Sequence, residues 1–432
     1  MKRKPRRAAS DDNSLIGVLK NLRGNSRACV LTEPLWTIPS NLYTPYFTLY
    51  MYSLNVRDGQ IGLLLAVGLF LQLLTSLAGG VLIDKFGRRR VTFITDLVAW
   101  SLPCFIWAVS QDFNWFLAAA ILNSFDQISA ASWQCLLVED TEAEKIVHIY
   151  NWCQIGGLLA VFFAPVSGLL IGRFSLIPVM RGLFIFSFLS MTAKFIILYL
   201  YSTETRQGVV RMAETRGKPL LSLFAEYGAV FKRAAANPAT VRALALSALS
   251  YICGMVTGNF FSIYITQDLN IPETYIAWFP IARAAVMLIF FFGAQKIFAR
   301  WKMKPAMITG IGLFCAAHAL LIAARFGAGG GMALLPVLFV YSVLDACATA
   351  LFFPRKDAIV ILDMEPAERA RTLSLIFMIT LGVSSPFGYL AGLLSEIDRR
   401  LPFLLNLVLF AAMLWIVGSA KEEKTEKAAV DY

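Results

Sequence analysis

The residues best able to do chemistry in this sequence are carboxylates that stand inside long apolar segments. Asp126 and Asp345 each lie near the middle of such a segment, with a polar residue three positions earlier. A charge near the centre of a bilayer costs on the order of 2.5 to 3.5 kcal/mol on insertion scales, so it needs a role or a partner. We predict that both aspartates exchange protons or bind a solute in a wet cavity of low dielectric. The alternative is a structural ion pair with Arg283 or Lys194.

A third acid, Glu33, begins a helical face that is rich in aromatic side chains. The aromatic residues that follow it at helical spacing are Trp36, Tyr43, Phe47 and Tyr50. Their counterparts in the second half of the chain are Asn259, Phe260, Phe261 and Tyr264. Aromatic rings beside carboxylates attract amphipathic or cationic solutes through stacking and cation–π interactions. We predict that Glu33 exchanges protons and that the other residues bind a substrate; packing against lipid or neighbouring helices is the alternative.

The elements that carry these residues are predicted to be membrane-spanning helices. The chain has 432 residues, of which 58% are hydrophobic and 16% are charged, whereas soluble proteins carry about 25% charged residues. Apolar stretches long enough to cross a bilayer recur along nearly the whole sequence. Twelve are predicted, near residues 28–53, 61–83, 91–110, 114–138, 147–172, 178–201, 241–266, 274–297, 305–325, 332–354, 372–395 and 401–419. This composition excludes a cytosolic enzyme, a nucleic-acid-binding protein and a disordered tail protein.

Basic residues are distributed unevenly between the predicted loops. If the N-terminus is cytoplasmic, 31 of the 39 Lys and Arg residues fall in cytoplasmic segments and five fall in outer loops. Cytoplasmic loops of membrane proteins carry such an excess of positive charge. No apolar run with a cleavage site follows the basic start of the chain, so we expect this start to be retained. The sequence therefore predicts a multi-pass protein of the cell inner (plasma) membrane with both termini in the cytoplasm.

The sequence repeats itself across its two halves. Residues Tyr46–Met51 recur as Phe260–Ile265, and Asn55 aligns with Asn270 in the loop that follows. Because each half has an even number of spans, both enter the membrane from the same side and form parallel repeats. The predicted organisation is a basic segment at 1–27, a six-helix bundle at 28–202, a linker at 203–240, a second six-helix bundle at 241–420 and a tail at 421–432. Apolar residues at helical spacing from Leu220 to Phe231 predict an amphipathic interfacial helix in the linker.

A basic motif with two glycines stands between the second and third predicted helices. Its residues are Gly80, Asp84, Lys85, Gly87, Arg88 and Arg89. Gly80 allows helices to approach closely, and Gly87 permits a tight turn. Asp84 can accept hydrogen bonds from the N-terminus of a neighbouring helix or from Arg88. A contact between the Asp84 carboxylate and another helix bundle forms only when the two bundles approach each other. Such a contact can therefore stabilise one of two conformations.

This motif closely resembles the loop signature of the major facilitator superfamily, in which glycine, aspartate, a basic residue, glycine and two basic residues occur at these spacings. The resemblance implies an all-α integral membrane protein with twelve transmembrane helices in two pseudo-symmetric six-helix bundles. It also implies a central cavity lined by the first, fourth, seventh and tenth helices. Pro165 and the small residues around it resemble, in part, a motif of the superfamily's antiporters. We expect the motif residues, Pro165 and Asp96 to form a conformational gate.

Three functions are compatible with these features. The leading hypothesis is proton-coupled export of amphipathic organic compounds by alternating access, with Asp126, Asp345 and Glu33 titrating. The second is proton-linked import of a metabolite such as a sugar or an organic acid, in which Arg283 recognises an anion. A membrane receptor that has kept the fold without transport is a remote third.

Several other classes of function and partner are not expected. The seven cysteines lie in predicted helices without metal-ligand or disulfide spacing, so we expect no metal site. No phosphate-binding loop occurs, and neither histidine belongs to a catalytic constellation, so we expect no enzyme, no primary pump and no cofactor. The expected partners are a small-molecule substrate, protons as the coupling ion and the lipid bilayer. We expect no nucleic acid partner and a monomeric protein.

Overall fold

A computed structural model describes residues 22–217, 238–290, 301–326, 331–362 and 369–419 of the chain. Within these ranges all regular secondary structure is helical, and nine stretches are long and apolar enough to cross a membrane. Helices also occupy the other three predicted spans. Those at 28–53 and 114–138 are broken into shorter helices. The predicted span at 274–297 is described only as far as residue 290. The predicted all-α membrane fold is therefore confirmed.

The first half of the chain builds its six spans from helices that are often interrupted by a tighter or wider turn. They are α3 (Gly24–Thr32), α4 (Pro34–Tyr43), η1 (Thr44–Tyr46), α5 (Phe47–Ser53), α6 (Asp58–Phe86), α7 (Arg88–Asp96), η2 (Leu97–Ser101), α8 (Leu102–Val109), α9 (Phe113–Asn123), α10 (Asp126–Val138), α11 (Ala143–Ala160), η3 (Val161–Phe163), α12 (Ala164–Phe174) and α13 (Leu176–Tyr201). Several of these helices begin with proline in the first turn, where its missing N–H is not needed.

A short helix and a second half complete the described chain. The short helix α14 (Arg206–Glu214) follows α13. The second half comprises α16 (Pro238–Ile263), η5 (Tyr264–Asp268), η6 (Glu273–Tyr275), α17 (Trp278–Ile289), α19 (Met303–Ala323), η8 (Ala324–Phe326), η9 (Gly331–Leu334), α20 (Leu335–Leu362), α21 (Arg369–Ile397) and α22 (Leu401–Ser419). The interfacial helix predicted between Leu220 and Phe231 lies outside the described residues.

Equivalent residues of the two halves make equivalent contacts. The hydroxyl of Tyr50 donates a hydrogen bond to the carbonyl of Trp107, and that of Tyr264 donates one to the carbonyl of Leu321, over the same sequence separation. Asn55 and Asn270 both adopt left-handed backbone conformations, with φ of 60° and 57°. Asparagine tolerates this region better than most residues do. The repeat seen in the sequence is therefore also a repeat of local structure.

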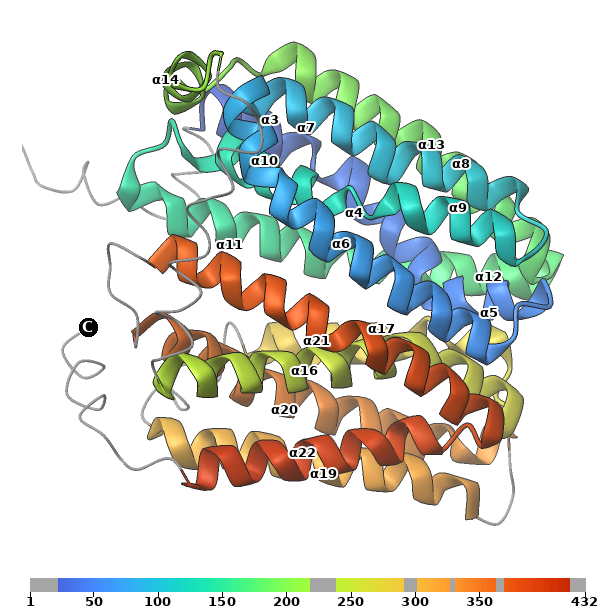
Figure 1. Cartoon of the computed structure of the whole chain (residues 1–432). Helices are drawn as coiled ribbons and strands as arrows, with labels where there is room; N and C mark the ends of the chain where they lie inside the picture. The colour runs from blue at the N-terminus through green and yellow to red at the C-terminus, as the bar shows by residue number, and fades with distance from the viewer. Residues whose placement is uncertain (1–21, 218–237, 291–300, 327–330, 363–368, 420–432) are drawn as a thin grey trace, which may run out of the picture.

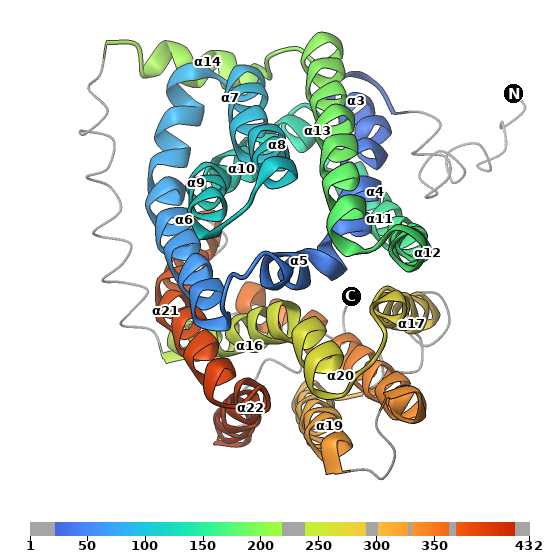
Figure 2. The ribbon, with the colours of Figure 1, turned by 90° about the vertical axis from the view of Figure 1, so that its right-hand side faces the viewer.

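The two halves lie side by side, and both run between the same two ends of the bundle (Figure 1). We call the end that carries α14 the linker end and the opposite end the far end. Helices α6 and α21 pack against each other, and they join the halves at the far end (Figures 1 and 2). Hydrogen bonds and ion pairs between described residues of the two halves join residues 52–66 of the first half to residues 385–399 of the second. These residues lie in the far half of α6 and α21 and next to it in the chain.

Candidate functional site

A cavity of about 510 Å³ lies between the two halves. Its walls come from α5, α6, α8, α9, α16 and α20, which include parts of the first, fourth, seventh and tenth spans. The lining residues are Phe47, Met51, Ile61, Leu64, Leu65, Gly68, Leu69, Gln72, Trp107, Phe116, Ala120, Asn123, Ser250, Tyr251, Gly254, Met255, Asn259 and Phe353. All of these described residues are uncharged, and most are apolar or aromatic. The cavity is thus suited to a largely apolar solute with a few hydrogen-bonding groups.

The break between α9 and α10 places a carboxylate next to the cavity wall. Asn123 lines the cavity at the end of α9 and donates a hydrogen bond to the carbonyl of Ala99. Asp126 begins α10 three residues later, and its carboxylate accepts a hydrogen bond of 3.2 Å from the indole of Trp100. No ion pair to Asp126 is found among the described residues. Of the three predicted proton-exchanging acids, it is the one without a cationic partner there.

Glu33 and Lys194 form an ion pair inside the first half. The Lys194 side chain is buried and that of Glu33 is 15% exposed, and the ammonium lies 2.9 Å from the carboxylate. The rings of Trp36, Trp133 and Phe195 surround this ammonium at 5.6 to 5.8 Å from their centroids, which is cation–π distance. Neutralisation by a partner is how a protein tolerates a buried charge. In this conformation Glu33 therefore already has a cation, supplied by the chain itself.

Asp345 and Arg283 form a comparable pair in the second half. The guanidinium of Arg283 lies 3.5 Å from the carboxylate of Asp345 and also donates a hydrogen bond to Thr349. This is the structural pairing that the sequence left open as an alternative for Asp345. Neither residue is among those that line the central cavity. An anion that sought Arg283 would have to compete with this carboxylate.

The residues predicted to bind substrate in the first and seventh spans divide into two groups. Phe47 and Asn259 line the cavity. Tyr43, Tyr50, Phe260 and Tyr264 are buried within their own halves, and Trp36 and Phe261 are half-buried against other rings. The helical spacing grouped these aromatic side chains on one face of the first span, but it could not tell packing inside a bundle from lining of a cavity. The cavity is also lined by Trp107, Phe116 and Tyr251, which were not predicted because no spacing pattern set them apart from their neighbours in the sequence.

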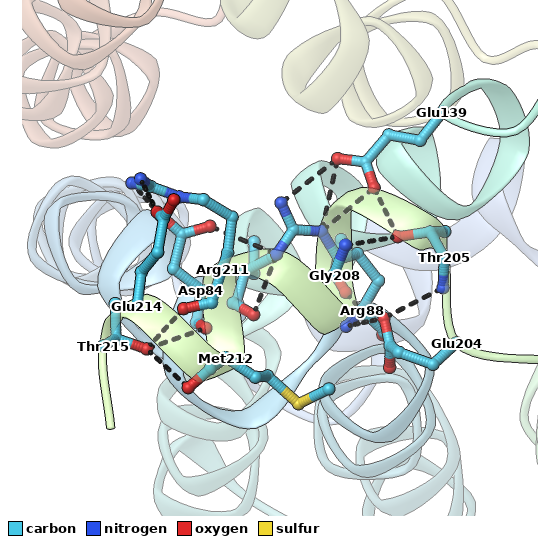
Figure 3. Close-up of polar contacts among 12 residues, drawn as sticks. Asp84, Arg88, Glu139, Glu204, Thr205, Gly208, Arg211, Met212, Glu214 and Thr215 are labelled. Atoms are coloured by element: carbon cyan, nitrogen blue, oxygen red, sulfur yellow. Dashed lines mark hydrogen bonds and ion pairs between the residues drawn. The ribbon is translucent and has the colours of Figure 1, made fainter. Parts of the chain in front are cut away.

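The basic motif and α14 form one polar network at the linker end (Figure 3). One carboxylate oxygen of Asp84 forms an ion pair with Arg88 at 3.1 Å. The other oxygen accepts two hydrogen bonds from Arg211 of α14, at 2.8 and 3.1 Å. Arg88 also pairs with Glu139 at 3.1 Å. Glu139 in turn accepts a hydrogen bond from Thr205. Asp84 is thus held by its own half and by the linker.

Glu204 caps the N-terminus of α7 from outside the helix. Its two carboxylate oxygens accept the backbone N–H groups of Arg88 and Arg89 at 2.9 and 3.1 Å. A carboxylate at this position satisfies orphan donors and complements the helix dipole. Gly87 has φ of 84°, and a Cβ there would lie 2.5 Å from this carboxylate. The glycine is therefore needed both for the turn and for the approach of Glu204.

The other residues predicted for the gate are Asp96, Gly80, Lys85 and Pro165. Asp96 is buried at the end of α7, where it accepts a hydrogen bond from Ser129. Gly80 lies within α6, and Lys85 is half-buried in the last turn of that helix. Pro165 begins α12 after the turn η3. The structure brings together Asp84, Gly87, Arg88 and Arg89, whereas Gly80, Asp96 and Pro165 lie elsewhere in their helices.

A glycine seam closes the far end and was not predicted. Gly388 and Gly392 of α21 pack on Gly62 of α6, and a Cβ on Gly62 would lie 2.6 Å from the carbonyl oxygen of Gly388. Two glycines four residues apart in an apolar helix are the known signal for such close packing, and this signal is present in the sequence. The seam holds the backbones of the two halves in direct contact.

Charged side chains fasten the seam at its end. Arg399 pairs with Asp58 and with Asp268, both at 3.3 Å, and it donates a hydrogen bond to Tyr52. Ser395 donates a 2.6 Å hydrogen bond to Asp58, which is buried. Arg399 thus bridges the two halves, since Asp58 and Tyr52 belong to the first half. In this conformation the far end is closed.

Comparisons with known proteins agree with this architecture. The family model described as Major Facilitator Superfamily matches residues 37–251 and again residues 243–431. A mutant of the nucleoside transporter NupG superposes with a TM-score of 0.70 at 15% identity, covering 91% of this chain and 99% of that one. A POT family transporter in complex with a thioalcohol-conjugated peptide gives 0.69 at 11% identity, covering 93% and 98%.

A bacterial homologue of the iron transporter ferroportin in an inward-facing state also gives a TM-score of 0.69 at 14% identity, covering 94% and 98%. No curated protein sequence matches the chain. At these identities the solved structures establish the fold alone. The tandem match of the family model agrees with the internal repeat, and it covers nearly the whole chain. The protein belongs to the major facilitator superfamily and is a multi-pass membrane transporter.

Proposed function

We propose that the protein exports amphipathic organic compounds in exchange for protons, by alternating access. The observation that carries this proposal is the central cavity, whose described walls are uncharged and largely aromatic or apolar. Such walls favour solutes that partition into membranes, through burial of apolar surface. An organic acid would need a cation in the cavity wall, and Arg283 is engaged with Asp345 instead. The cavity therefore supports the export hypothesis over the import of an anionic metabolite.

Asp126 is the proposed proton carrier of the exchange. It follows the cavity-lining Asn123, and only an indole N–H is found to bond its side chain among the described residues. Glu33 and Asp345 have cationic partners at 2.9 and 3.5 Å, so a proton would compete with an internal charge at either site. A carboxylate without a cationic partner can take up a proton when the cavity opens to one side of the membrane and release it when the cavity opens to the other side.

The proposed orientation places the linker end in the cytoplasm of the plasma (inner) membrane. The excess of basic residues in the linker-end loops supports it. The closed far end then faces outward, and the structure corresponds to an inward-facing state. A membrane-impermeant thiol reagent added to intact cells should label a cysteine introduced at Arg57 and should spare one introduced at Asp140. The reverse pattern would overturn the orientation.

Accumulation of a fluorescent lipophilic cation in expressing cells tests the proposed export. Cells that contain the protein should accumulate less dye than cells without it, and a protonophore should abolish the difference. Asp126→Asn should abolish it as well, whereas the control Asp357→Asn, which alters an exposed acid, should not. Equal accumulation with and without the protein would contradict broad cationic export. Dye accumulated above the level of control cells would indicate import.

A further inference from the structure

Helix α14 lies at the margin of the first half, at the linker end of the bundle. Figure 1 shows it end-on beside the ends of α7 and α13, and Figure 2 shows it running across the outer margin of the same half. One of its faces is therefore turned toward the bundle and the opposite face is turned away from it. In a membrane-spanning protein, a helix at this place lies at the boundary between the lipid headgroups and water.

The inward face of α14 is occupied by the polar network. Gly208 and Thr215 are buried, and Arg211 binds Asp84. The hydroxyl of Thr215 donates to the backbone carbonyl of Asp84 as well. This face of the helix has its partners within the protein.

The outward face combines apolar and cationic side chains. Val209 and Val210 are 55% and 49% exposed. Arg206 at the start of α14 and Arg216 two residues past its end are exposed, and Arg90 in the first turn of α7 is exposed as well. The side chains of these three arginines form no ion pair within the described parts of the chain. The acid next to Arg206, Asp140, accepts a bond from its backbone and not from its guanidinium.

We propose that the outward face of α14 binds an anionic phospholipid of the adjacent leaflet. Guanidinium groups match a phosphate with paired hydrogen bonds, which suits Arg206 and Arg216. The two valines lie between these arginines along the chain, where they can contact the start of the acyl chains. Charge complementarity thus selects a phosphate headgroup with net negative charge over a zwitterionic one.

A lipid bound to this face couples to the gate motif through the body of the helix. It holds α14 against the bundle, and the opposite face of α14 holds Asp84 through Arg211 and α7 through the preceding Glu204. The lipid therefore favours the arrangement in which Asp84 is bound by the linker. This inference is independent of the substrate and of the coupling ion.

The test uses the full chain in lipid nanodiscs of phosphatidylcholine with increasing phosphatidylglycerol. Native mass spectrometry counts the phosphatidylglycerol molecules retained by the protein, and hydrogen exchange reports on the backbone amides of α14. In the unaltered chain we expect retained phosphatidylglycerol and slower exchange in α14 as its fraction rises. The double variant Arg206→Gln/Arg216→Gln should bind about 25-fold more weakly, since each arginine near a charged surface contributes roughly a factor of five. Its exchange should not respond to the lipid.

Two further variants separate a specific site from general charge. Arg23→Gln/Arg27→Gln removes the same charge from two other exposed arginines, one in α3 and one just before it, and should leave both readouts unchanged. Arg206→Lys/Arg216→Lys keeps the charge but loses the paired hydrogen bonds, so its binding should lie between that of the unaltered chain and that of the glutamine variant. Equal loss in the Arg23/Arg27 control, or undiminished binding in the Arg206/Arg216 glutamine variant, would overturn the proposed site. Retained lipid without slower exchange in α14 would overturn the coupling to the gate.

Discussion

Gly392→Ala should open the far end of the transporter. A Cβ at this position would lie 2.7 Å from the carbonyl oxygen of Asp58 and 2.8 Å from the Cα of Gly62, and ordinary contacts begin at 3.4 Å. The two helices would therefore have to separate by about 0.7 Å at the seam. Overpacking of this kind costs about 1 to 3 kcal/mol. The cost arises only in the conformation in which α6 and α21 touch, so the closed far end should lose population by roughly 5- to 150-fold relative to the open one.

Double electron–electron resonance can measure this shift in population. Spin labels are placed on cysteines introduced at Arg57 and Ile397, which are exposed on opposite halves at the far end, in a chain whose native cysteines are replaced by alanine. Gly392→Ala should move the distance distribution toward longer distances. Gly68→Ala is the matched control, because it adds the same methyl group to α6 with nothing within 4 Å. An unchanged distribution for Gly392→Ala, or an equal shift for the control, would refute the role of the seam.

Three further predictions concern the two ends of the bundle. Arg399→Gln removes the side chain that joins Asp58 to Asp268, so the same spin labels should report a more open far end, whereas Arg400→Gln, which loses contacts to Asp398 and to the ring of Phe326 within the second half, should not; equal distributions would contradict the bridge. Gly87→Ala should expel Glu204 from the N-terminus of α7, and the amides of Arg88 and Arg89 should then exchange faster, while Gly79→Ala, which meets only ordinary contacts, should leave them protected. Hydrogen bonds from Arg400 hold the pKa of Asp398 at about 2, below its usual value near 4, so its contribution to stability is full above about pH 4 and is lost as the pH falls through 2. Asp398→Asn should therefore lower the melting temperature at pH 7 and have no effect near pH 2, and a constant difference at both pH values would contradict this.

Much of the fold could be predicted from the sequence because a bilayer imposes strong constraints. Long apolar stretches must be helical where they meet lipid, and the predicted spans correspond to helices. The repeat was also visible, since Tyr50 and Tyr264, and Asn55 and Asn270, are alike in type and in local structure.

The candidate site was less predictable because burial inside a bundle and exposure to a cavity need the same apolar residues. Tyr50 and Phe47 share one predicted face, yet Tyr50 is buried within its half and Phe47 lines the cavity. The pairing of Asp84 with Arg88, four residues away, was predicted and is present. The partner of Glu33 and the second partner of Asp84 could not be chosen, since Lys194 and Arg211 lie more than a hundred residues away in sequence. Only packing of the helices decides which of several cations meets each acid.

Reconstituted transport under an imposed pH gradient tests proton-coupled export through Asp126 most directly. Proteoliposomes that contain the purified chain are loaded with a lipophilic fluorescent cation, and its flux is followed with and without a pH gradient at zero membrane potential. We predict that solute moves against its own gradient when protons flow down theirs in the opposite direction, and that Asp126→Asn abolishes this uphill movement while Asp357→Asn preserves it. Uphill movement that persists in Asp126→Asn would contradict the assignment of the proton carrier. Flux that is indifferent to the pH gradient in the unaltered chain would contradict proton coupling itself.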